Sequence, residues 1–429
     1  MIPGMQNTDV LVVGGGLAGW RAAEAAAKAG AEVAVVANGA GNSPDIHALN
    51  VPVGPGDSVE LFLSDTLESG RGACDPALAE ILCRGAVALA DEFPWDRGAD
   101  GSLDMLQPVG CSVPRCVSIG HRIGAWALAK LRRELADRVR FIRGRVVEIQ
   151  VDSSTKARDA GEGAAAFTAR LEDGETLTAT AVVLATGGWC GRCDFSDNPP
   201  ELRGDGIEMA KKLGAAVRDM DAVQYEPTVA LAPGAVRGIP VITTMLHEGA
   251  TFRNRDGAEF LPDRHARKAD LSKTIFAEIA AGRGVQCPAV GKRDTRRAPG
   301  RSDSPESEPS LEQAEFGVWF DATAVPENVL RGRYADTVRR YAAAGVDITR
   351  EPMLVAPAPH TSLGGVVIDT RCRVMRPDGS PIPGLFAAGE VTGGIHGLDR
   401  IGGNAGTEVL VFGRIAGAEA AGFSGNGKE

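Results

Sequence analysis

The sequence predicts an α/β protein with a Rossmann-like, doubly wound domain and an inserted α+β domain. Three short apolar strands, each next to glycines, support this prediction. The first, residues 9–13, is followed by an alanine-rich helix at 17–29 and a strand at 32–36, which together form a βαβ unit. The other two lie at 181–185 and 384–388. Because these strands lie on both sides of the middle of the chain, before residue 223 and after residue 355, we expect the N- and C-terminal parts to build one domain.

The middle of the chain has a different character. It carries helical patterns at 271–281 and 329–344, and we expect it to form a capping domain. Within it, a stretch at about 289–313 is rich in Arg, Ser, Pro and Glu and nearly free of apolar residues. Such a stretch cannot offset its ordering entropy, so we predict a mobile surface loop. The predicted boundaries are 1–222 and 356–429 for the two parts of the doubly wound domain, and 223–355 for the capping domain.

The composition excludes several functional classes. The 429 residues are 44% hydrophobic and 24% charged, which suffices for a large core, and the net charge of -10 argues against a nucleic-acid binder. No apolar run approaches the roughly 18–20 residues of a membrane span, and the first residues do not resemble a signal peptide. Eight cysteines in so long a chain do not indicate a disulfide scaffold. We therefore expect a cytoplasmic protein with reduced thiols.

A glycine-rich turn follows the first strand. Gly14, Gly16 and Gly19 satisfy G-x-G-x-x-G at the start of the first helix. Gly14 permits the tight turn, Gly16 lets the backbone approach a pyrophosphate, and Gly19 allows the helix to pack closely on the strand. The helix N-terminus adds free N–H groups and a partial positive charge. Asn38 follows the second strand in place of the acid expected to bind the adenosine ribose, which leaves both NAD and FAD open at this point.

Several blocks, in order along nearly the whole chain, resemble the flavoprotein subunits of succinate dehydrogenase and fumarate reductase, a family that includes L-aspartate oxidase. The strongest is the run PGLFAAGEVTGGIHGLDRIGGNAGTEVLVFGRIAG at 383–417. The other blocks are DSVELFLSDTLESGRGACD at 57–75, ATGG at 185–188, GDG at 204–206, DAVQYEPT at 221–228, Glu-Gly at 248–249 and GRG at 282–284.

The resemblance implies an FAD cofactor. Glu390 can accept a hydrogen bond from a ribityl or ribose hydroxyl, and a helix beginning near Ala405 can point its N-terminus at the isoalloxazine. Respiratory members bind the flavin covalently through a histidine, whereas Pro44 stands at that point here and His47 follows nearby, so we predict noncovalent FAD. The positions that match cofactor-binding residues, or lie in loops expected beside the flavin, are Gly14, Gly16, Gly19, Asn38, Thr186, Gly187, Asp205, Glu390, Asn404, Ala405 and Gly406.

Two residues match the family's substrate ligands. Arg400, in GLDRIGGN, stands where the family's arginine clamps a substrate carboxylate, which a planar guanidinium does bidentately. His360, in APHTSLGG, matches the family's substrate-contacting histidine. The resemblance thus implies a small carboxylate-bearing substrate.

Three neighbouring positions depart from the family. Glu226 replaces the histidine of the family's His-Pro-Thr; this carboxylate would repel a substrate carboxylate, so an ammonium, an amide or a hydroxyl suits it better. Thr243 stands where the family has an acid of its proton relay. The family's catalytic arginine corresponds to Lys268, with Arg267 beside it. Either could move a proton, or both could belong to a solvated basic edge.

We therefore predict an FAD-dependent oxidoreductase that transfers a hydride between flavin N5 and a carbon near a carboxylate, on a substrate other than fumarate. Lys268, Glu226, His360 and Arg400 are the candidate catalytic residues, and an electron-transfer protein is the expected partner. Two alternatives stay open. One is an amino-acid oxidase or dehydrogenase like L-aspartate oxidase, with Glu226 holding the ammonium; the other is a flavin-containing electron-transfer subunit without its own substrate.

Cys190 and Cys193 form a C-x-x-C motif, which can indicate a metal site or a redox pair. A zinc or iron–sulfur site needs four ligands at tighter, paired spacings, which this sequence does not offer. We therefore expect ordinary thiols and no metal site.

Overall fold

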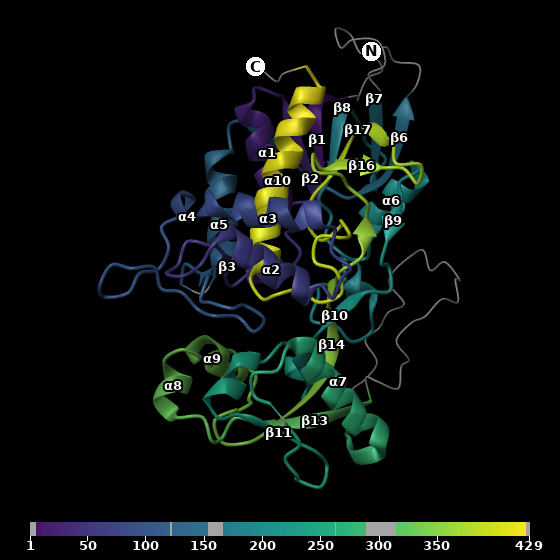
Figure 1. Ribbon diagram of the computed structural model, residues 1–429. Helices are drawn as coiled ribbons and strands as arrows, with labels where there is room; N and C mark the ends of the chain where they lie inside the picture. The colour runs from purple at the N-terminus through teal and green to yellow at the C-terminus, as the bar shows by residue number, and fades with distance from the viewer. Residues whose placement is uncertain (1–5, 121, 153–165, 262, 289–314, 426–429) are drawn as a thin grey trace. The chain divides into compact units, whose positions relative to one another are not determined.

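The computed structural model describes residues 6–120, 122–152, 166–261, 263–288 and 315–425 (Figure 1). The loop predicted at about 289–313 lies outside these residues. The chain divides into two compact units. The first, called the dinucleotide unit below, comprises Met1–Trp189, Glu201–Val223 and Ser362–Glu429, and the second, called the inserted unit, comprises Cys190–Pro200 and Gln224–Thr361.

A mixed sheet forms the centre of the dinucleotide unit. Its strand order is β16-β17-β8-β1-β2-β5, and the neighbours from β17 to β5 run parallel. β16 joins one edge antiparallel, and β7 and β6 add an antiparallel extension to β8. The four strands expected from sequence, at 9–13, 32–36, 181–185 and 384–388, are confirmed as parts of this one sheet. The strands are β1 (Gln6–Val13), β2 (Val33–Ala37), β5 (Val139–Arg143), β6 (Val146–Asp152), β7 (Ala166–Leu171), β8 (Thr176–Leu184), β16 (Arg373–Met375) and β17 (Pro381–Ala387).

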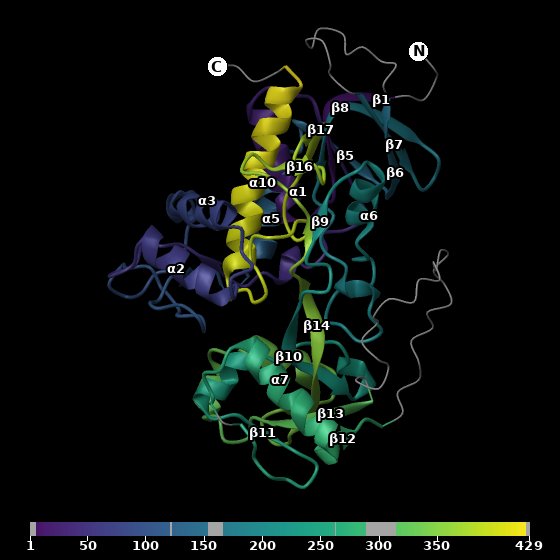
Figure 2. The same cartoon turned by 45° about the vertical axis from the view of Figure 1, so that its right-hand side comes forward.

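Two long helices pack against each other beside this sheet. Both views show α10 (Asn404–Phe423) running alongside α1 (Leu17–Lys28) (Figures 1 and 2). Glycines permit the close approach: a Cβ on Gly417 would lie 2.0 Å from the Ala22 carbonyl oxygen, and one on Gly413 would lie 2.7 Å from that of Ala18. The unit's other helices are α2 (Val59–Ser69), α3 (Pro76–Val87), α4 (Leu89–Glu92), α5 (Ile123–Glu134) and α6 (Asp205–Lys212). Two short pairs, β3 (Leu49–Asn50) with β4 (Cys116–Val117) and β9 (Val217–Arg218) with β15 (Gly365–Val366), complete it.

The inserted unit is an antiparallel sheet covered by helices. The strands β10 (Val223–Ala232), β14 (Met353–Ser362), β13 (Phe316–Asp321) and β11 (Thr251–Arg253) follow one another across it, and β12 (Val285–Gln286) pairs with β13. The helix α7 (Lys268–Glu278) lies over the sheet (Figure 2) because Leu271 and Ile275 join its apolar core. The predicted inserted α+β domain is therefore present.

One helix prediction was wrong. Residues 329–344 were expected to form a single helix, but the structure has α8 (Glu327–Arg331) and α9 (Ala335–Ala343). Gly332 separates them with φ -92° and ψ -93°, outside the helical region. Leu330 of α8 and Tyr341 of α9 are both buried in the core of the inserted unit.

Candidate functional site

The carboxyl ends of four parallel strands bring several predicted cofactor residues to one edge of the sheet. The registers place Val13 of β1 beside Val36 of β2 and Leu184 of β8, and Leu184 beside Ala387 of β17. Ligands of open α/β sheets bind outside this edge. The residues that follow these strand ends are Gly14, Asn38, Thr186, Gly187 and Glu390.

The glycine-rich turn has the geometry expected from its sequence. Gly14 adopts a φ of +124°, and a Cβ there would lie 2.1 Å from the Ala185 carbonyl oxygen. A Cβ on Gly19 would lie 2.1 Å from the Gly14 carbonyl oxygen, so the helix packs directly on the turn. Gly16 is the N-cap of α1 and offers no side-chain cap, and the first turn of α1 carries no acidic residue. The helix N-terminus is thus compatible with an anionic pyrophosphate.

The loop after β8 is closely packed against its neighbours. A Cβ on Gly188 would lie 2.3 Å from Oε1 of Glu390, the atom that accepts hydrogen bonds from the Ser362 backbone N–H at 2.9 Å and hydroxyl at 3.1 Å. The Thr186 hydroxyl is buried and has no hydrogen-bond partner among the described residues. Gly206 leaves room for this hydroxyl, since a Cβ there would lie 2.1 Å from it. A buried hydroxyl without a partner at this edge is compatible with a bound polar cofactor.

Asp205 has a structural partner that sequence reasoning did not foresee. Its carboxylate lies in the first turn of α6 and accepts hydrogen bonds from Nε of Arg145 at 3.0 Å and from Nη2 at 2.7 Å. A carboxylate at a helix N-terminus is also favoured by the helix dipole. Its predicted contact with the cofactor remains a prediction.

A helix does begin where the sequence predicted one near Ala405. α10 starts at Asn404, whose side chain accepts a hydrogen bond from Nδ2 of Asn50 at 2.7 Å and donates one to the Thr66 hydroxyl at 3.3 Å. Gly406 permits close packing, because a Cβ there would lie 2.2 Å from the Leu49 side chain. The start of α10 is therefore fixed by buried amide hydrogen bonds.

Arg400 lies in the loop that leads into α10. Its side chain is half-buried, and Nη1 donates to the Ile401 carbonyl oxygen at 3.3 Å. A planar guanidinium such as this one can bind a carboxylate bidentately.

In the inserted unit, Glu226 sits in a polar cluster on β10. Glu226 and Thr228 are two positions apart on the strand and therefore share one face. Oε1 of Glu226 accepts hydrogen bonds from the hydroxyls of Thr243 at 2.5 Å and Thr228 at 3.1 Å. Oε2 accepts one from Nζ of Lys268. Glu226 is only 4% exposed, so its ionised carboxylate depends on these partners.

Lys268 stands at the N-terminus of a helix, where a positive charge is unfavourable. It is the first residue of α7, where the helix dipole repels a cation, and the carboxylate of Glu226 offsets that repulsion. Its side chain is about a third exposed, whereas that of Glu226 is buried. Of the two proposed proton donors, Lys268 therefore contacts the polar cluster, while Arg267 is the N-cap residue of the helix.

The charges around Glu226 decide its ionisation. Burial raises the pKa of Glu226, but the positive charges of Lys268 and His360 and the hydrogen bonds from Lys268 and Thr243 outweigh burial and lower this pKa to about 2. The cluster thus carries a carboxylate at neutral pH, and His360 lies close enough to stabilise it.

This shift predicts a change in acid stability. Because the pKa of Glu226 is lower in the folded than in the unfolded chain, its contribution is complete above pH 4.5 and disappears as the pH falls towards 2. We expect the wild type to lose about 2 kcal/mol more stability than E226Q between pH 5 and pH 2.5. Urea unfolding at both pH values measures the difference. E327Q, which removes an exposed ion pair with Arg331, should lose as much stability as the wild type over this pH range. If E226Q and the wild type lost the same amount, the lowered pKa of Glu226 would be contradicted.

His360 lies on β14 and is paired with a residue that sequence reasoning missed. Its Nδ1 lies 2.6 Å from Oδ2 of Asp197, whose side chain is 5% exposed. In the sequence, the feature that could have pointed to Asp197 is the polar triplet Ser196-Asp197-Asn198. Such triplets are common in turns, so the signal is weak.

The cysteines and the described surface add no second site. All eight cysteines are free thiols, and burial raises the pKa of Cys83, Cys111 and Cys116 to about 12 each. Among the described residues, no group of three or more His, Cys, Asp or Glu side chains could hold a metal ion. No helix in the described ranges is long and apolar enough to span a bilayer.

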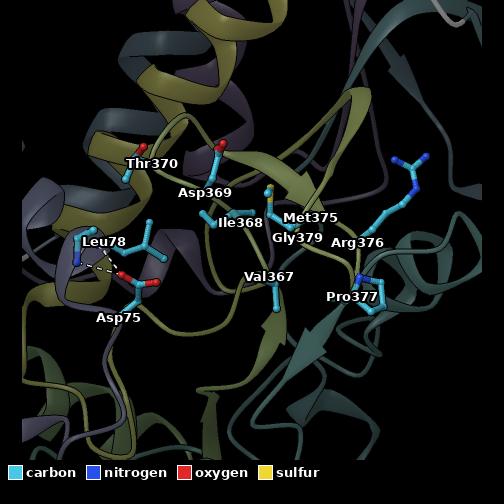
Figure 3. Close-up of a pocket in the computed structure, with 12 residues that line it drawn as sticks. Asp75, Leu78, Val367, Ile368, Asp369, Thr370, Met375, Arg376, Pro377 and Gly379 are labelled. Carbon is cyan, nitrogen blue, oxygen red and sulfur yellow. Dashed lines mark hydrogen bonds between the residues drawn. The ribbon is translucent and has the colours of Figure 1, made fainter.

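A surface hollow of about 430 Å³ in the dinucleotide unit contains none of the predicted site residues. Figure 3 shows Asp75 and Leu78 on one side and Arg376 and Pro377 on the other. Asp75 is already the N-cap of α3, since its Oδ1 accepts from the backbone N–H groups of Ala77 and Leu78. The Asp75 carboxylate is thus already engaged, and the hollow is separate from the candidate site residues.

Comparison with known proteins supports the same relationship. The chain matches the family model described as "FAD binding domain" over residues 9–405. It is 29% identical to a fumarate reductase (CoM/CoB) subunit from Methanothermobacter marburgensis, over 97% of this chain and 73% of that protein. It is also 29% identical to the L-aspartate oxidase of Caulobacter vibrioides, over 96% of this chain and 76% of that protein. The solved structure of E. coli quinol fumarate reductase is similar with a TM-score of 0.80 at 25% identity, covering 99% of this chain and 72% of that chain.

Proposed function

Because the chain belongs to the FAD-binding flavoprotein family of fumarate reductases, succinate dehydrogenases and L-aspartate oxidases, we propose that this FAD-dependent oxidoreductase reversibly reduces a carbon–carbon double bond of a small carboxylic acid. The observation that carries the proposal is the contact between Lys268 and the buried carboxylate of Glu226. It holds an exchangeable proton at a fixed place, as general acid–base catalysis requires.

The residues at the sheet edge fit an FAD molecule. The glycine turn at Gly14 and Gly16 would take the pyrophosphate, Glu390 a hydroxyl of the cofactor, and the N-terminus of α10 the isoalloxazine. When bound, FAD supplies the hydride or accepts it. An electron-transfer protein is proposed as partner, because one relative is by name part of a larger assembly.

We expect the flavin to be noncovalent, since Pro44 cannot form the covalent bond that a histidine forms in respiratory relatives. Acid precipitation of the holoprotein should leave all the flavin in the supernatant, where its fluorescence and mass identify free FAD. A yellow protein pellet would contradict this expectation. The H47A variant then reports whether His47 is the attachment point.

The substrate we propose carries one carboxylate and an uncharged second end. Arg400 would bind the carboxylate through its bidentate face. Both oxygens of Glu226 already accept hydrogen bonds, and its charge would repel a second carboxylate. In the reducing direction, Lys268 gives its proton to the carbon next to the one that receives the hydride. Glu226 stabilises the ammonium form that is restored afterwards.

The amino-acid oxidase alternative is less well supported by this cluster. A substrate ammonium would have to displace the Lys268 ammonium from Glu226, and both would compete for one buried carboxylate. A cationic substrate would gain little there, whereas an amide or hydroxyl could approach without a charge conflict.

An anaerobic absorbance titration tests the proposal. A panel of 2-enoates, saturated monocarboxylates, dicarboxylates and amino acids is added to the oxidised and to the dithionite-reduced holoprotein. We expect 2-enoates to reoxidise the reduced flavin, and the R400A variant, still loaded with FAD, to need at least tenfold more of them. Bleaching by amino acids only would favour the oxidase, and a flavin that no compound perturbs would favour an electron-transfer subunit. Normal turnover by R400A would overturn the carboxylate clamp.

A further inference from the structure

The segment 190–200 belongs to the inserted unit and holds the end of β14 at two backbone positions. The Ser196 hydroxyl donates to the Pro359 carbonyl oxygen at 2.7 Å. The Asn198 amide donates to the His360 carbonyl oxygen at 2.8 Å. The backbone next to the His360 imidazole is therefore held by a segment that lies 162 to 163 positions away in sequence.

Asp197 lies between these two contacts and reaches the imidazole itself. Its Oδ2 is 2.6 Å from Nδ1 of His360, and its Oδ1 accepts a hydrogen bond from the Asn198 amide at 2.9 Å. The Asp197 side chain is 5% exposed and the His360 side chain 27% exposed. The carboxylate is thus on the buried side of the ring. Among the described residues, Nε2 of His360 has no hydrogen-bond partner.

We propose that Asp197 is a positioning residue for His360: it keeps a proton on Nδ1 and directs Nε2 at an oxygen of the substrate. A buried carboxylate fixes both the tautomer and the orientation of a histidine ring in this way. The role rests on the proposed function, in which His360 contacts the substrate. The inserted unit then holds two acid–base pairs, Asp197 with His360 and Glu226 with Lys268, each made of a buried acid and a more accessible base.

The tautomer can be read without any substrate. We would label the holoprotein with [¹⁵N]histidine and assign the His360 signals among the six histidines by comparison with H360Q. Nδ1 of His360 should carry a proton in the wild type, and D197A should lose this preference while D197E retains it. D347A is the matched control, because it removes a half-exposed carboxylate of the same unit that bonds to Thr349 and does not touch the ring. A wild-type ring protonated only on Nε2, or a D197A spectrum equal to the wild type, would overturn the proposal.

Kinetics then test whether the fixed ring matters for catalysis. With the substrate found by titration, D197A should lower kcat/KM by about 10- to 100-fold, mainly through KM, and D197E should restore part of it. D347A should change kcat/KM less than threefold. An unchanged KM for D197A would overturn the positioning role even if the tautomer shifts. If no carboxylic acid perturbs the flavin while the tautomer behaves as expected, the proposed function fails instead, and the substrate-directed part of this role fails with it.

Discussion

Replacing Lys268 with methionine is expected to slow reoxidation of the reduced flavin by the substrate about 100- to 10,000-fold, while FAD stays bound. Methionine keeps the length of the side chain and removes the only group of Lys268 that can give a proton. Hydride transfer to a double bond leaves negative charge on the neighbouring carbon unless a proton arrives there. Arg267, one residue away, is the N-cap of α7 and is not expected to take over.

Anaerobic stopped-flow absorbance measures this effect, with K273M as the matched control. Lys273 lies on the same helix and is exposed, so its replacement should leave the rate within twofold of the wild type. K268M also leaves the Glu226 carboxylate buried without its cation, which lowers stability. The double variant E226Q/K268M removes that charge. It should regain stability but not rate, which separates the two roles of the lysine.

Two results would contradict the assignment. If E226Q/K268M recovered the rate along with stability, Lys268 would act only by stabilising the cluster. If K268M kept the wild-type rate, the proton would come from another group. K268R, which restores the family's residue type, should keep more activity than K268M because a guanidinium also pairs with Glu226.

The elements predicted correctly are those fixed by local sequence. The βαβ unit follows from a short apolar strand, a glycine turn and an alanine-rich helix, and each of these acts within a few residues. The positive φ of Gly14 is likewise a local requirement of the turn. The helix predicted at 329–344 failed because a single glycine costs a helix only about 1 kcal/mol. Packing on the core of the inserted unit breaks the helix at Gly332, and the sequence pattern does not reveal that packing.

The candidate site was predictable as a set of residues but not as a set of contacts. Sequence comparison with a family singled out Glu226, Thr243 and Lys268 as three separate departures. The structure shows that Glu226 accepts hydrogen bonds from both Thr243 and Lys268. The carboxylate that the family has at position 243 is therefore replaced by a carboxylate at position 226. The partners Glu226 and Lys268 are 42 positions apart, and Asp197 and His360 are 163 apart. Spacing rules for helices and strands do not extend over such distances.

Replacing Arg115 with methionine is expected to destabilise the dinucleotide unit by about 3–5 kcal/mol. The Arg115 side chain is fully buried, at 0% exposure, and lies between two acids of the α2 region. It binds Asp57 through Nε at 3.2 Å and Nη2 at 2.9 Å, and Nη1 lies 2.9 Å from Asp65. Its guanidinium also stacks over the Phe62 ring at 4.7 Å. Without the cation, two carboxylates remain buried close together, and at least one of them must be protonated or hydrated for the unit to fold.

Urea unfolding followed by circular dichroism and flavin fluorescence measures this loss as a lower transition midpoint, which stays meaningful even if the two units unfold separately. R84M is the matched control: it removes an ion pair with Glu80 in which both side chains are about half exposed, and such a pair is worth at most about 1 kcal/mol. The triple variant D57N/R115M/D65N removes both stranded charges and should recover much of the lost stability. If R115M unfolded at the wild-type midpoint, the two acids would be stabilised by other partners. The ion pairs of Arg115 would then not be what holds the loop before β4 against α2. If the triple variant were no more stable than R115M, the loss would come from the missing packing on Phe62 rather than from unpaired charge.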